Sequence, residues 1–197
     1  MDKNEVIAYF DRCAPAWDST LTVDEEKIGS ILDAAGVGQG STVLDVACGT
    51  GVLFPFYLKR GASRVTGVDI SPEMIRVAAA KFHDPRIETV CGDMETLPVG
   101  SVYDCCVIYN AFPHFPQPQK LIERLALWVK PGGRLTVAHS MGVEALNRRH
   151  AGDAAHVSRG MISAEELSEL MSPYFCADIL ISGEDRYIVS GIRAGRE

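Results

Sequence analysis

The chain has 197 residues, of which 47% are apolar, so it is long enough for one domain with a packed core. Its 19 basic and 26 acidic residues give a formal net charge of −7, and residues 1–50 carry much of the acidic excess. A non-specific nucleic-acid binder carries a basic surface instead, because its basic groups replace the counterions of the phosphates. Composition therefore argues against nucleic acid and anionic membranes as partners.

Targeting and redox features are few. No window approaches 18 uninterrupted apolar residues, so no membrane span is expected. Residues 1–5 are too acidic and too polar for a secretory signal. The six cysteines form no CxxC pair and no zinc spacing, which predicts reduced core thiols in a cytoplasmic protein. Of these, Cys105 and Cys106 are expected on opposite faces of one strand.

The chain alternates between helical and strand-like patterns. An amphipathic helix is expected over 5–12 and a second helix over 24–35, which ends at Gly36. Five strands are then expected at 42–46, 64–69, 87–91, 102–109 and 134–139, with helices at 52–60, 71–82 and 120–129. After an irregular or partly helical stretch at 140–162, a capping box at Ser163 begins a helix that runs to about residue 171. Two closing strands are expected at 174–182 and 186–192.

This alternation predicts a single α/β domain over residues 1–197, built on a doubly wound, mostly parallel sheet of seven strands with helices on both faces. The final two strands have no room for a helix between them, so they should be antiparallel. Within the domain, residues 1–36 are interpreted as an N-terminal helical lid and residues 140–162 as a substrate-side insertion.

The strongest local pattern is VLDVACGTG over residues 43–51, a buried strand that runs into a glycine turn and then a helix. Glycine permits positive φ and lets a ligand approach the backbone, while the helix N-terminus offers unpaired N–H groups. Asp69 ends the next strand and Asp93 follows the one after it, while Asp45 lies at the carboxyl end of the first. Turns and caps also favour Asp, but three acids at the carboxyl ends of parallel strands favour a ligand site.

An NAD site is the competing interpretation of this turn. The dinucleotide fingerprint needs a third small residue, because the helix and strand pack closely there. Here Phe54 occupies that position. Asp45 would also sit poorly beside a pyrophosphate, whereas it suits a ligand with an ammonium group, and Asp93 suits an adenine amine.

Four segments carry a family resemblance: residues 43–51, VDISPEM at 68–74, GDM at 92–94 followed by Leu97-Pro98, and KPGGRL at 130–135. They resemble the motifs of class I S-adenosylmethionine-dependent methyltransferases, in particular the small-molecule group that includes the ubiquinone/menaquinone type. The resemblance covers residues 5–140 by motif and 163–192 by element order. It implies a Rossmann-like methyltransferase fold with an antiparallel last strand, S-adenosylmethionine as cofactor, and methyl transfer to a small molecule by in-line displacement.

The resemblance also implies a set of cofactor-binding residues. Asp45 would hold the ammonium directly or through water, Asp69 would bind the ribose hydroxyls, and Asp93 would accept from the adenine amine. The backbone of the glycine turn would lie along the methionine part, and Asn110 would lie near the methyl-donating end. The full implied set is Asp45, Ala47, Gly49, Gly51, Asp69, Ile70, Met74, Gly92, Asp93, Met94 and Asn110.

The substrate side has fewer signals. Residues 9–18 are similar to the family's N-terminal lid, so Tyr9 and Trp17 are expected to close over cofactor and substrate, or else to serve ordinary helix packing. Phe112 and His150 are further candidates, and the aromatic residues Tyr109, Phe112 and Phe115 suggest a small, partly apolar acceptor. The segment with Asn147, Arg148, Arg149 and Arg159 would bind an anionic acceptor or form a solvated loop.

Two histidines are candidate bases or acceptor-positioning groups. His114 follows the fourth strand and His139 ends the fifth, so both are expected near the methyl end, where a neutral imidazole accepts a proton. A structural hydrogen bond is the alternative for each. No metal site is expected, because His139, His150 and His156 match no zinc spacing.

The alternative functions are a non-catalytic S-adenosylmethionine-binding or partner protein and, with less support, an NAD-dependent oxidoreductase. Residues 110–113 read NAFP, which departs from the Asn/Asp-Pro-Pro-aromatic pattern typical of enzymes that methylate amide or base nitrogens. The acceptor atom and the oligomeric state stay open.

Overall fold

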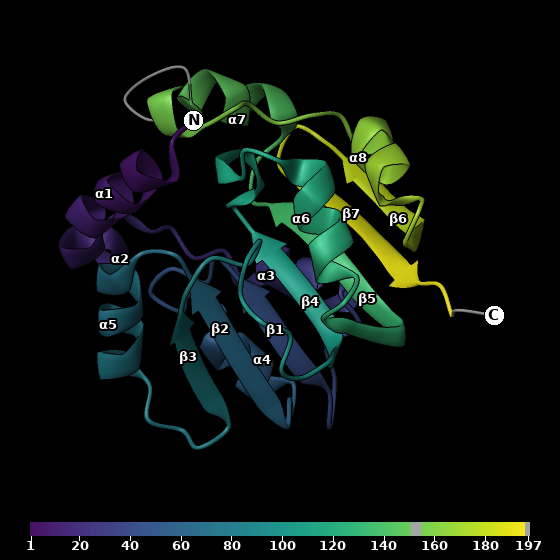
Figure 1. Cartoon of the computed structure of the whole chain (residues 1–197), viewed down its shortest axis with the longest axis horizontal. Coiled ribbons are helices and arrows are strands. Elements are labelled where there is room, and N and C mark those ends of the chain that lie inside the picture. Colours follow the sequence, from purple (N-terminus) through teal and green to yellow (C-terminus); the bar gives the residue numbers. More distant parts are fainter. Residues whose placement is uncertain (151–154, 196–197) are drawn as a thin grey trace.

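The computed structural model describes residues 1–150 and 155–195, and it contains one seven-stranded sheet between two layers of helices (Figure 1). The strands are β1 (Thr42–Val46), β2 (Arg64–Asp69), β3 (Ile87–Cys91), β4 (Tyr103–Tyr109), β5 (Val129–His139), β6 (Phe175–Ser182) and β7 (Tyr187–Arg193). The α-helices are α1 (Lys3–Cys13), α2 (Trp17–Thr20), α3 (Glu25–Ala34), α4 (Phe54–Lys59), α5 (Pro72–Lys81), α6 (Pro118–Leu125), α7 (Val143–His150) and α8 (Ala164–Met171). Short 3₁₀ turns are η1 (Ala14–Ala16), η2 (Phe112–His114) and η3 (Ala155–Val157).

The sheet has the order β3-β2-β1-β4-β5-β7-β6. Strands β3, β2, β1, β4 and β5 pair in parallel, and β7 runs antiparallel to both β5 and β6. The predicted doubly wound sheet and its antiparallel strand are therefore confirmed. The chain winds in opposite directions from β1 and from β4, and the carboxyl ends of these two strands flank the crevice where open α/β sheets bind ligands.

Side chains alternate between the two faces of the sheet. Cys105 packs in one cluster with α3, α4 and α5, whereas Cys106 packs in the other with α6 and α8. The expectation that this pair points to opposite faces is confirmed. The six cysteines are free thiols.

Helix starts follow the capping residues. Asp24 accepts a hydrogen bond from the Lys27 N–H at 3.0 Å before α3, and Ser71 accepts one from the Met74 N–H at 3.1 Å before α5. Ser163 begins α8 with the predicted capping box. Ser71 follows β2 by two residues, so α5 begins directly after the end of that strand.

One predicted boundary is wrong. The helix expected over 120–129 ends at Leu125, and the segment KPGG belongs to β5 rather than to the helix end. The β4–β5 register jumps from Tyr103 opposite Val129 to Cys105 opposite Arg134, so residues 130–133 form a bulge. A Cβ on Gly133 would lie 2.8 Å from the carbonyl oxygen of Asp104, which explains glycine at this close approach.

The N-terminal segment splits into two parts. Helices α1 and α2 lie beside α5, above the carboxyl ends of the strands (Figure 1). Helix α3 instead packs against the sheet, where Ile28 and Ile31 are fully buried. The segment 140–162 contains α7 and η3, and η3 contacts α1.

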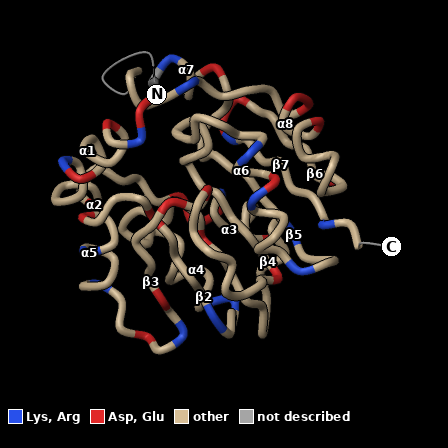
Figure 2. Tube along the Cα trace, viewed as in Figure 1, with Lys and Arg blue, Asp and Glu red and all other residues tan. Residues whose placement is uncertain are grey.

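Charged residues of both signs are spread over the fold. Figure 2 shows basic and acidic positions interspersed along the trace. Within the part of the chain that the structure describes, no helix has the length and apolar composition needed to cross a bilayer.

Candidate active site

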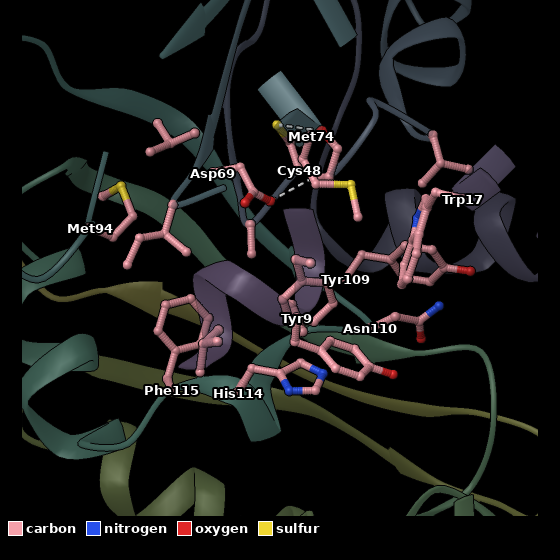
Figure 3. A pocket seen from close by; sticks show the side chains of 18 of the residues that line it. Tyr9, Trp17, Cys48, Asp69, Met74, Met94, Tyr109, Asn110, His114 and Phe115 are labelled. Carbon is pink, nitrogen blue, oxygen red and sulfur yellow. Dashed lines mark hydrogen bonds between the residues drawn. The ribbon is translucent and has the colours of Figure 1, made fainter. Parts of the chain in front are cut away.

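A cavity of about 410 Å³ opens at the carboxyl ends of β1, β2 and β4, beneath the N-terminal helices. Its volume falls within the range of roughly 300–1,000 Å³ found for small-molecule sites. Figure 3 shows Asp69, Cys48 and Met74 at one end, and Tyr9, His114 and Phe115 at the other. Most of the predicted site residues line it: Tyr9, Trp17, Ala47, Gly49, Asp69, Ile70, Met74, Gly92, Asp93, Met94, Asn110 and His114.

The turn after β1 has an unusual backbone. Ala47, Gly49 and Gly51 all have positive φ, at 56°, 55° and 81°. At the alanine this conformation costs on the order of 1–3 kcal/mol, and such strain is concentrated at functional sites. The backbone of Ala47 and Gly49 lines the cavity, whereas Gly51 does not. Gly51 serves packing, because a Cβ there would lie 2.6 Å from the Phe54 ring.

Asp69, at the end of β2, is the best-positioned carboxylate in the cavity wall. Its Oδ2 accepts from the Gly49 N–H at 2.8 Å and its Oδ1 accepts from the Ser71 N–H at 2.9 Å. Burial raises the pKa of Asp69, although these backbone hydrogen bonds work to lower it. Each carboxylate oxygen accepts more than one hydrogen bond, so both oxygens retain capacity toward a ligand.

Asp45 lies beneath the cavity and is not part of its wall. The residue is 2% exposed. Burial and the nearby charge of Asp69 raise the pKa of Asp45 well above the usual aspartate range. A cation in the cavity would lower that pKa again, because it stabilises the charged carboxylate.

Phe54 bears on the NAD alternative. Its fully buried ring fills the space above Gly67 of β2, where a Cβ would collide with that ring and lie 2.9 Å from the Cys48 sulfur. Gly67, on β2, therefore leaves room for the large side chain of Phe54 at the third position of the fingerprint. The close helix–strand packing of the dinucleotide motif is absent at this turn.

An ion-pair group anchors the start of α1 to the loop after β3. The Lys3 Nζ donates to Asp93 Oδ2 and to Glu95 Oε2, both at 2.6 Å. Burial works to lower the pKa of Lys3, but the hydrogen bonds to these two carboxylates raise it overall. Sequence reasoning missed Lys3, because its partners lie about 90 positions away and no local pattern links them.

Two further contacts hold the N-terminal helices α1 and α2 near the glycine turn. Asp18 of α2 accepts from the Thr50 hydroxyl at 2.5 Å and from Lys81 at 2.6 Å. Asp11 of α1 accepts from the Ser71 hydroxyl at 2.6 Å. Together these contacts connect α1 and α2 to the first turn after β1 and to both ends of α5.

Several apolar side chains contribute to the cavity wall. Phe10, Phe115, Met141 and Leu146 line it together with the predicted Tyr9. His114 belongs to η2, after β4, and its Nδ1 lies 2.7 Å from the carbonyl oxygen of Val157. The Phe10 ring meets the His114 ring edge-on, with the ring centroids 5.0 Å apart.

Two candidates, His139 and Phe112, are buried in the core and do not line the cavity. His139 is fully buried beside Tyr187, with ring centroids 6.1 Å apart, so its expected approach to the methyl end does not hold. It follows Leu135 and Val137 on one face of β5, which faces the core. Phe112 is also buried in that core. His150 ends α7, and its side chain lies outside the described part of the chain.

The basic residues of the segment 140–162 also lie away from the cavity, so far as the structure describes them. Asn147 bonds to the backbone N–H and carbonyl of Met161, at 2.6 and 3.2 Å. Arg148 pairs with Glu144 on the surface, and Arg159 is exposed. Among the described residues, no group of three or more His, Cys, Asp or Glu side chains is arranged to hold a metal ion.

Residues 43–133 match the family model of a methyltransferase domain. The malonyl-[acyl-carrier protein] O-methyltransferase of Acetivibrio thermocellus is 30% identical over 138 residues, which cover 68% of this chain and 49% of that protein. The demethylmenaquinone methyltransferase of Renibacterium salmoninarum is 34% identical over 143 residues, with coverages of 68% and 58%. The chain thus spans about half the length of these curated relatives. These matches assign residues 43–133 to a methyltransferase domain, and the chain is similar to S-adenosylmethionine-dependent methyltransferases.

The fold agrees with this assignment. The solved magnesium protoporphyrin IX methyltransferase of Synechocystis, with bound S-adenosylhomocysteine, superposes with a TM-score of 0.74 at 19% identity and covers 98% of this chain and 100% of that one. The matched family segment contains the glycine turn, Asp69, Asp93 and His114, but neither α1 and α2 nor residues 140–162. The matched segment therefore supplies the glycine turn, Asp69 and Asp93 as well as His114, and the N-terminal helices and residues after 133 complete the cavity wall.

Proposed function

We propose that the chain binds S-adenosylmethionine in this cavity and transfers its methyl group to a small-molecule acceptor. The observation that carries the proposal is the cavity at the carboxyl ends of β1, β2 and β4, where the matched methyltransferase segment supplies the glycine turn and Asp69. About half of each curated relative lies outside the region that matches this chain, so the substrates of those relatives are not carried over to it.

The charge of the cavity wall fits the cofactor. S-adenosylmethionine carries a sulfonium and an ammonium against one carboxylate, so it is a net cation. Among the described residues of the wall, the acidic side chains are Asp69 and Asp93, and the Lys or Arg side chain is Lys3. Lys3 is paired to Asp93. The wall is therefore net acidic, and the buried Asp45 beneath it adds a carboxyl that a cation would ionise.

Each part of the cofactor has proposed partners in this chain. Asp69 accepts from the ribose hydroxyls, and the backbone of Ala47 and Gly49 lies along the methionine part. Asp93 accepts from the adenine amine while it keeps its bond to Lys3. The remaining proposed cofactor contacts are Ile70, Met74, Gly92, Met94 and Asn110, which all line the cavity.

When bound, S-adenosylmethionine supplies a methyl group on an already activated sulfur, so the protein's main contribution is positioning. Trp17 and Tyr9, from the lid, exclude water and hold the acceptor at the methyl end. Asn110 supports this geometry: it adopts a φ of 55°, and its side-chain oxygen accepts from the Ser140 N–H at 2.9 Å.

Calorimetric titration tests the proposed cofactor. S-adenosylmethionine and S-adenosylhomocysteine should bind, and NAD should not. Asp69→Asn should weaken binding at least about tenfold, because a carboxylate hydrogen bond contributes about 1.5–3 kcal/mol. The control Asp33→Asn changes an exposed carboxylate on α3 and should bind normally. Tight binding of NAD, or unchanged affinity in Asp69→Asn, would refute the assignment. Binding without turnover of any metabolite would favour the non-catalytic alternative.

We also propose a cytoplasmic location. Free thiols at all six cysteines support it, because disulfides form and persist in oxidising compartments. Measuring the thiol content of the protein purified under non-reducing conditions tests this point, and a structural disulfide would contradict it.

A further inference from the structure

We propose that Lys3 is a positioning residue for cofactor recognition: it holds the Asp93 carboxylate where it accepts from the adenine amine, against the repulsion of Glu95. The inference rests on the proposed function, which gives Asp93 to the adenine amine. Lys3 lies outside residues 43–133, so the family match does not supply it. Its role follows from the contacts around Asp93 and from the burial of Glu95.

The loop after β3 fixes the backbone of Asp93 and one of its carboxylate oxygens. The Asp93 carbonyl accepts from the N–H groups of Thr96 and Leu97, at 2.9 and 2.8 Å. Its side-chain Oδ1 accepts from the Glu95 N–H, also at 2.9 Å. These bonds are local to the loop, and they engage Oδ1 only. The orientation of Oδ2 therefore depends on a contact from elsewhere in the fold.

Lys3 supplies that contact. Its Nζ donates to Asp93 Oδ2 and to Glu95 Oε2, both at 2.6 Å. Lys3 is the first residue of α1, and the other end of this helix is tied to the start of α5 by the hydrogen bond from the Ser71 hydroxyl to Asp11, at 2.6 Å. The position of the ammonium is therefore set by the packing of a helix, and not by the loop that it contacts.

Glu95 explains why this position needs a cation. Its side chain is 1% exposed, and its Oε1 has no hydrogen-bond partner among the described residues. A buried carboxylate without a cation is costly, so the Lys3 ammonium compensates its charge. The oxygens of Asp93 and Glu95 that share this ammonium lie at most twice 2.6 Å apart. Without Lys3 the two carboxylates would repel each other, and Asp93 would turn away from its position.

This arrangement has a consequence for the base of the cofactor. Lys3 and Asp93 both line the cavity. A carboxylate oxygen accepts more than one hydrogen bond, so Asp93 binds a donor from the ligand while it keeps its bond to Lys3. Adenine offers an amine donor, whereas hypoxanthine offers a carbonyl oxygen, a second acceptor, at the same place. A carboxylate held in position should therefore select for adenine, and this selection should depend on Lys3.

Calorimetric titration with S-adenosylhomocysteine and with S-inosylhomocysteine, its hypoxanthine analogue, measures the selection as a ratio of affinities. The wild type should bind S-adenosylhomocysteine at least about 30-fold more tightly, because the analogue replaces a charge-assisted hydrogen bond by a contact between two acceptors. Lys3→Met keeps the length of the side chain without its charge, and it should lower this ratio at least about fivefold. Lys3→Arg keeps the charge and should bring the ratio back toward the wild-type value.

The ratio separates positioning from a purely structural role. If Lys3 only stabilised the fold, Lys3→Met would weaken the binding of both ligands by the same factor, and the unchanged ratio would overturn the proposal. Tighter binding of S-adenosylhomocysteine to Lys3→Met would also overturn it, because Lys3 would then compete with adenine for Asp93. The matched control is Lys59→Met, which removes an exposed lysine of α4 and should keep the wild-type ratio.

The Glu95→Gln background tests the part given to Glu95, and it leaves no buried charge that could prevent folding. In this background Lys3→Met removes the anchor of Oδ2 but creates no repulsion. The ratio should still fall at least about twofold, yet by less than Lys3→Met lowers it in the wild type. An unchanged ratio would overturn the anchoring role of Lys3. Equal losses in the two backgrounds would overturn the role of Glu95.

The same titrations keep this inference separate from the proposed function. Binding of S-adenosylhomocysteine that depends on Asp69, with a ratio that is insensitive to Lys3, refutes the inference alone. Absence of S-adenosylhomocysteine binding to the wild type refutes the proposed function, and the inference with it.

Discussion

Replacing Gly51 with alanine should destabilise the chain strongly, because two separate costs meet at this position. Its φ of 81° lies in the left-handed region, and a Cβ would lie 2.6 Å from the Phe54 ring and 2.9 Å from the Phe82 ring. Both rings are packed against the sheet side of α4 and α5, so neither moves away cheaply. The glycine turn is therefore held by packing beneath it as well as by its own backbone.

Three other glycines separate these costs. Gly40 has a φ of 80° and no atom within 4 Å of the position that a Cβ would take, so Gly40→Ala should cost about 1–2 kcal/mol from conformation alone. Gly67 has no positive φ but a crowded Cβ position against Phe54, so Gly67→Ala should cost about 1–3 kcal/mol. Gly38 has neither feature and should change stability by about 0.5 kcal/mol or less. Gly51→Ala should combine the first two, about 2–5 kcal/mol.

Chemical denaturation of the four variants and the wild type provides the assay, with thermal unfolding as a second readout. For a chain of this length each kcal/mol lowers Tm by about 2–4 °C. The reasoning would be refuted if Gly51→Ala were no less stable than Gly38→Ala. It would also be refuted if Gly51→Ala lost cofactor affinity without any loss of stability, since Gly51 does not line the cavity.

The remaining predictions concern buried and paired carboxylates. Asp45→Asn should raise stability at neutral pH by on the order of 1 kcal/mol. The pKa of Asp45 is raised in the folded state, so the wild-type free energy of unfolding falls as pH rises above the ordinary aspartate value of about 3.9. Asparagine does not titrate, so the variant lacks this fall. Equal pH profiles of the two proteins in denaturation would contradict the prediction. In the same pH range, binding of S-adenosylmethionine should release protons and tighten as pH rises, because the cation lowers the pKa of Asp45. A binding enthalpy that does not depend on the ionisation enthalpy of the buffer would argue against this coupling. Asp18→Asn should cost about 1 kcal/mol or less in stability, yet speed the release of S-adenosylhomocysteine in stopped-flow fluorescence, because the contacts to Thr50 and Lys81 hold the lid. An unchanged release rate would show that these contacts do not limit lid opening.

The sheet is accessible to prediction because its strands are short apolar runs that end at chemically distinctive residues. β1, β2 and β3 have the expected bounds, and the acids that end or follow them lie together at one edge of the sheet. The parallel arrangement alone requires that convergence. The cofactor end of the cavity follows from these local signals.

The end of the cavity that is proposed to hold the acceptor is harder to predict from the sequence. The place of His139 at the end of a strand predicts an approach to the methyl end, yet its alternation with Leu135 and Val137 already indicates the core face. The carbonyl of Val157 and the Lys3 ion pairs carry no local pattern, since each depends on segments far apart in the sequence. Asp45 lies beside the glycine turn, as its place in the sequence requires, but its separation from the cavity depends on the depth of packing.

The most direct measurement is a crystal structure of the protein with S-adenosylhomocysteine. The account predicts density in the cavity at the ends of β1, β2 and β4, with the ribose hydroxyls on Asp69, the adenine between Ile70 and Met74, and the methionine part along Gly49. Density elsewhere in the molecule, or a ligand whose ribose makes no contact with Asp69, would contradict it.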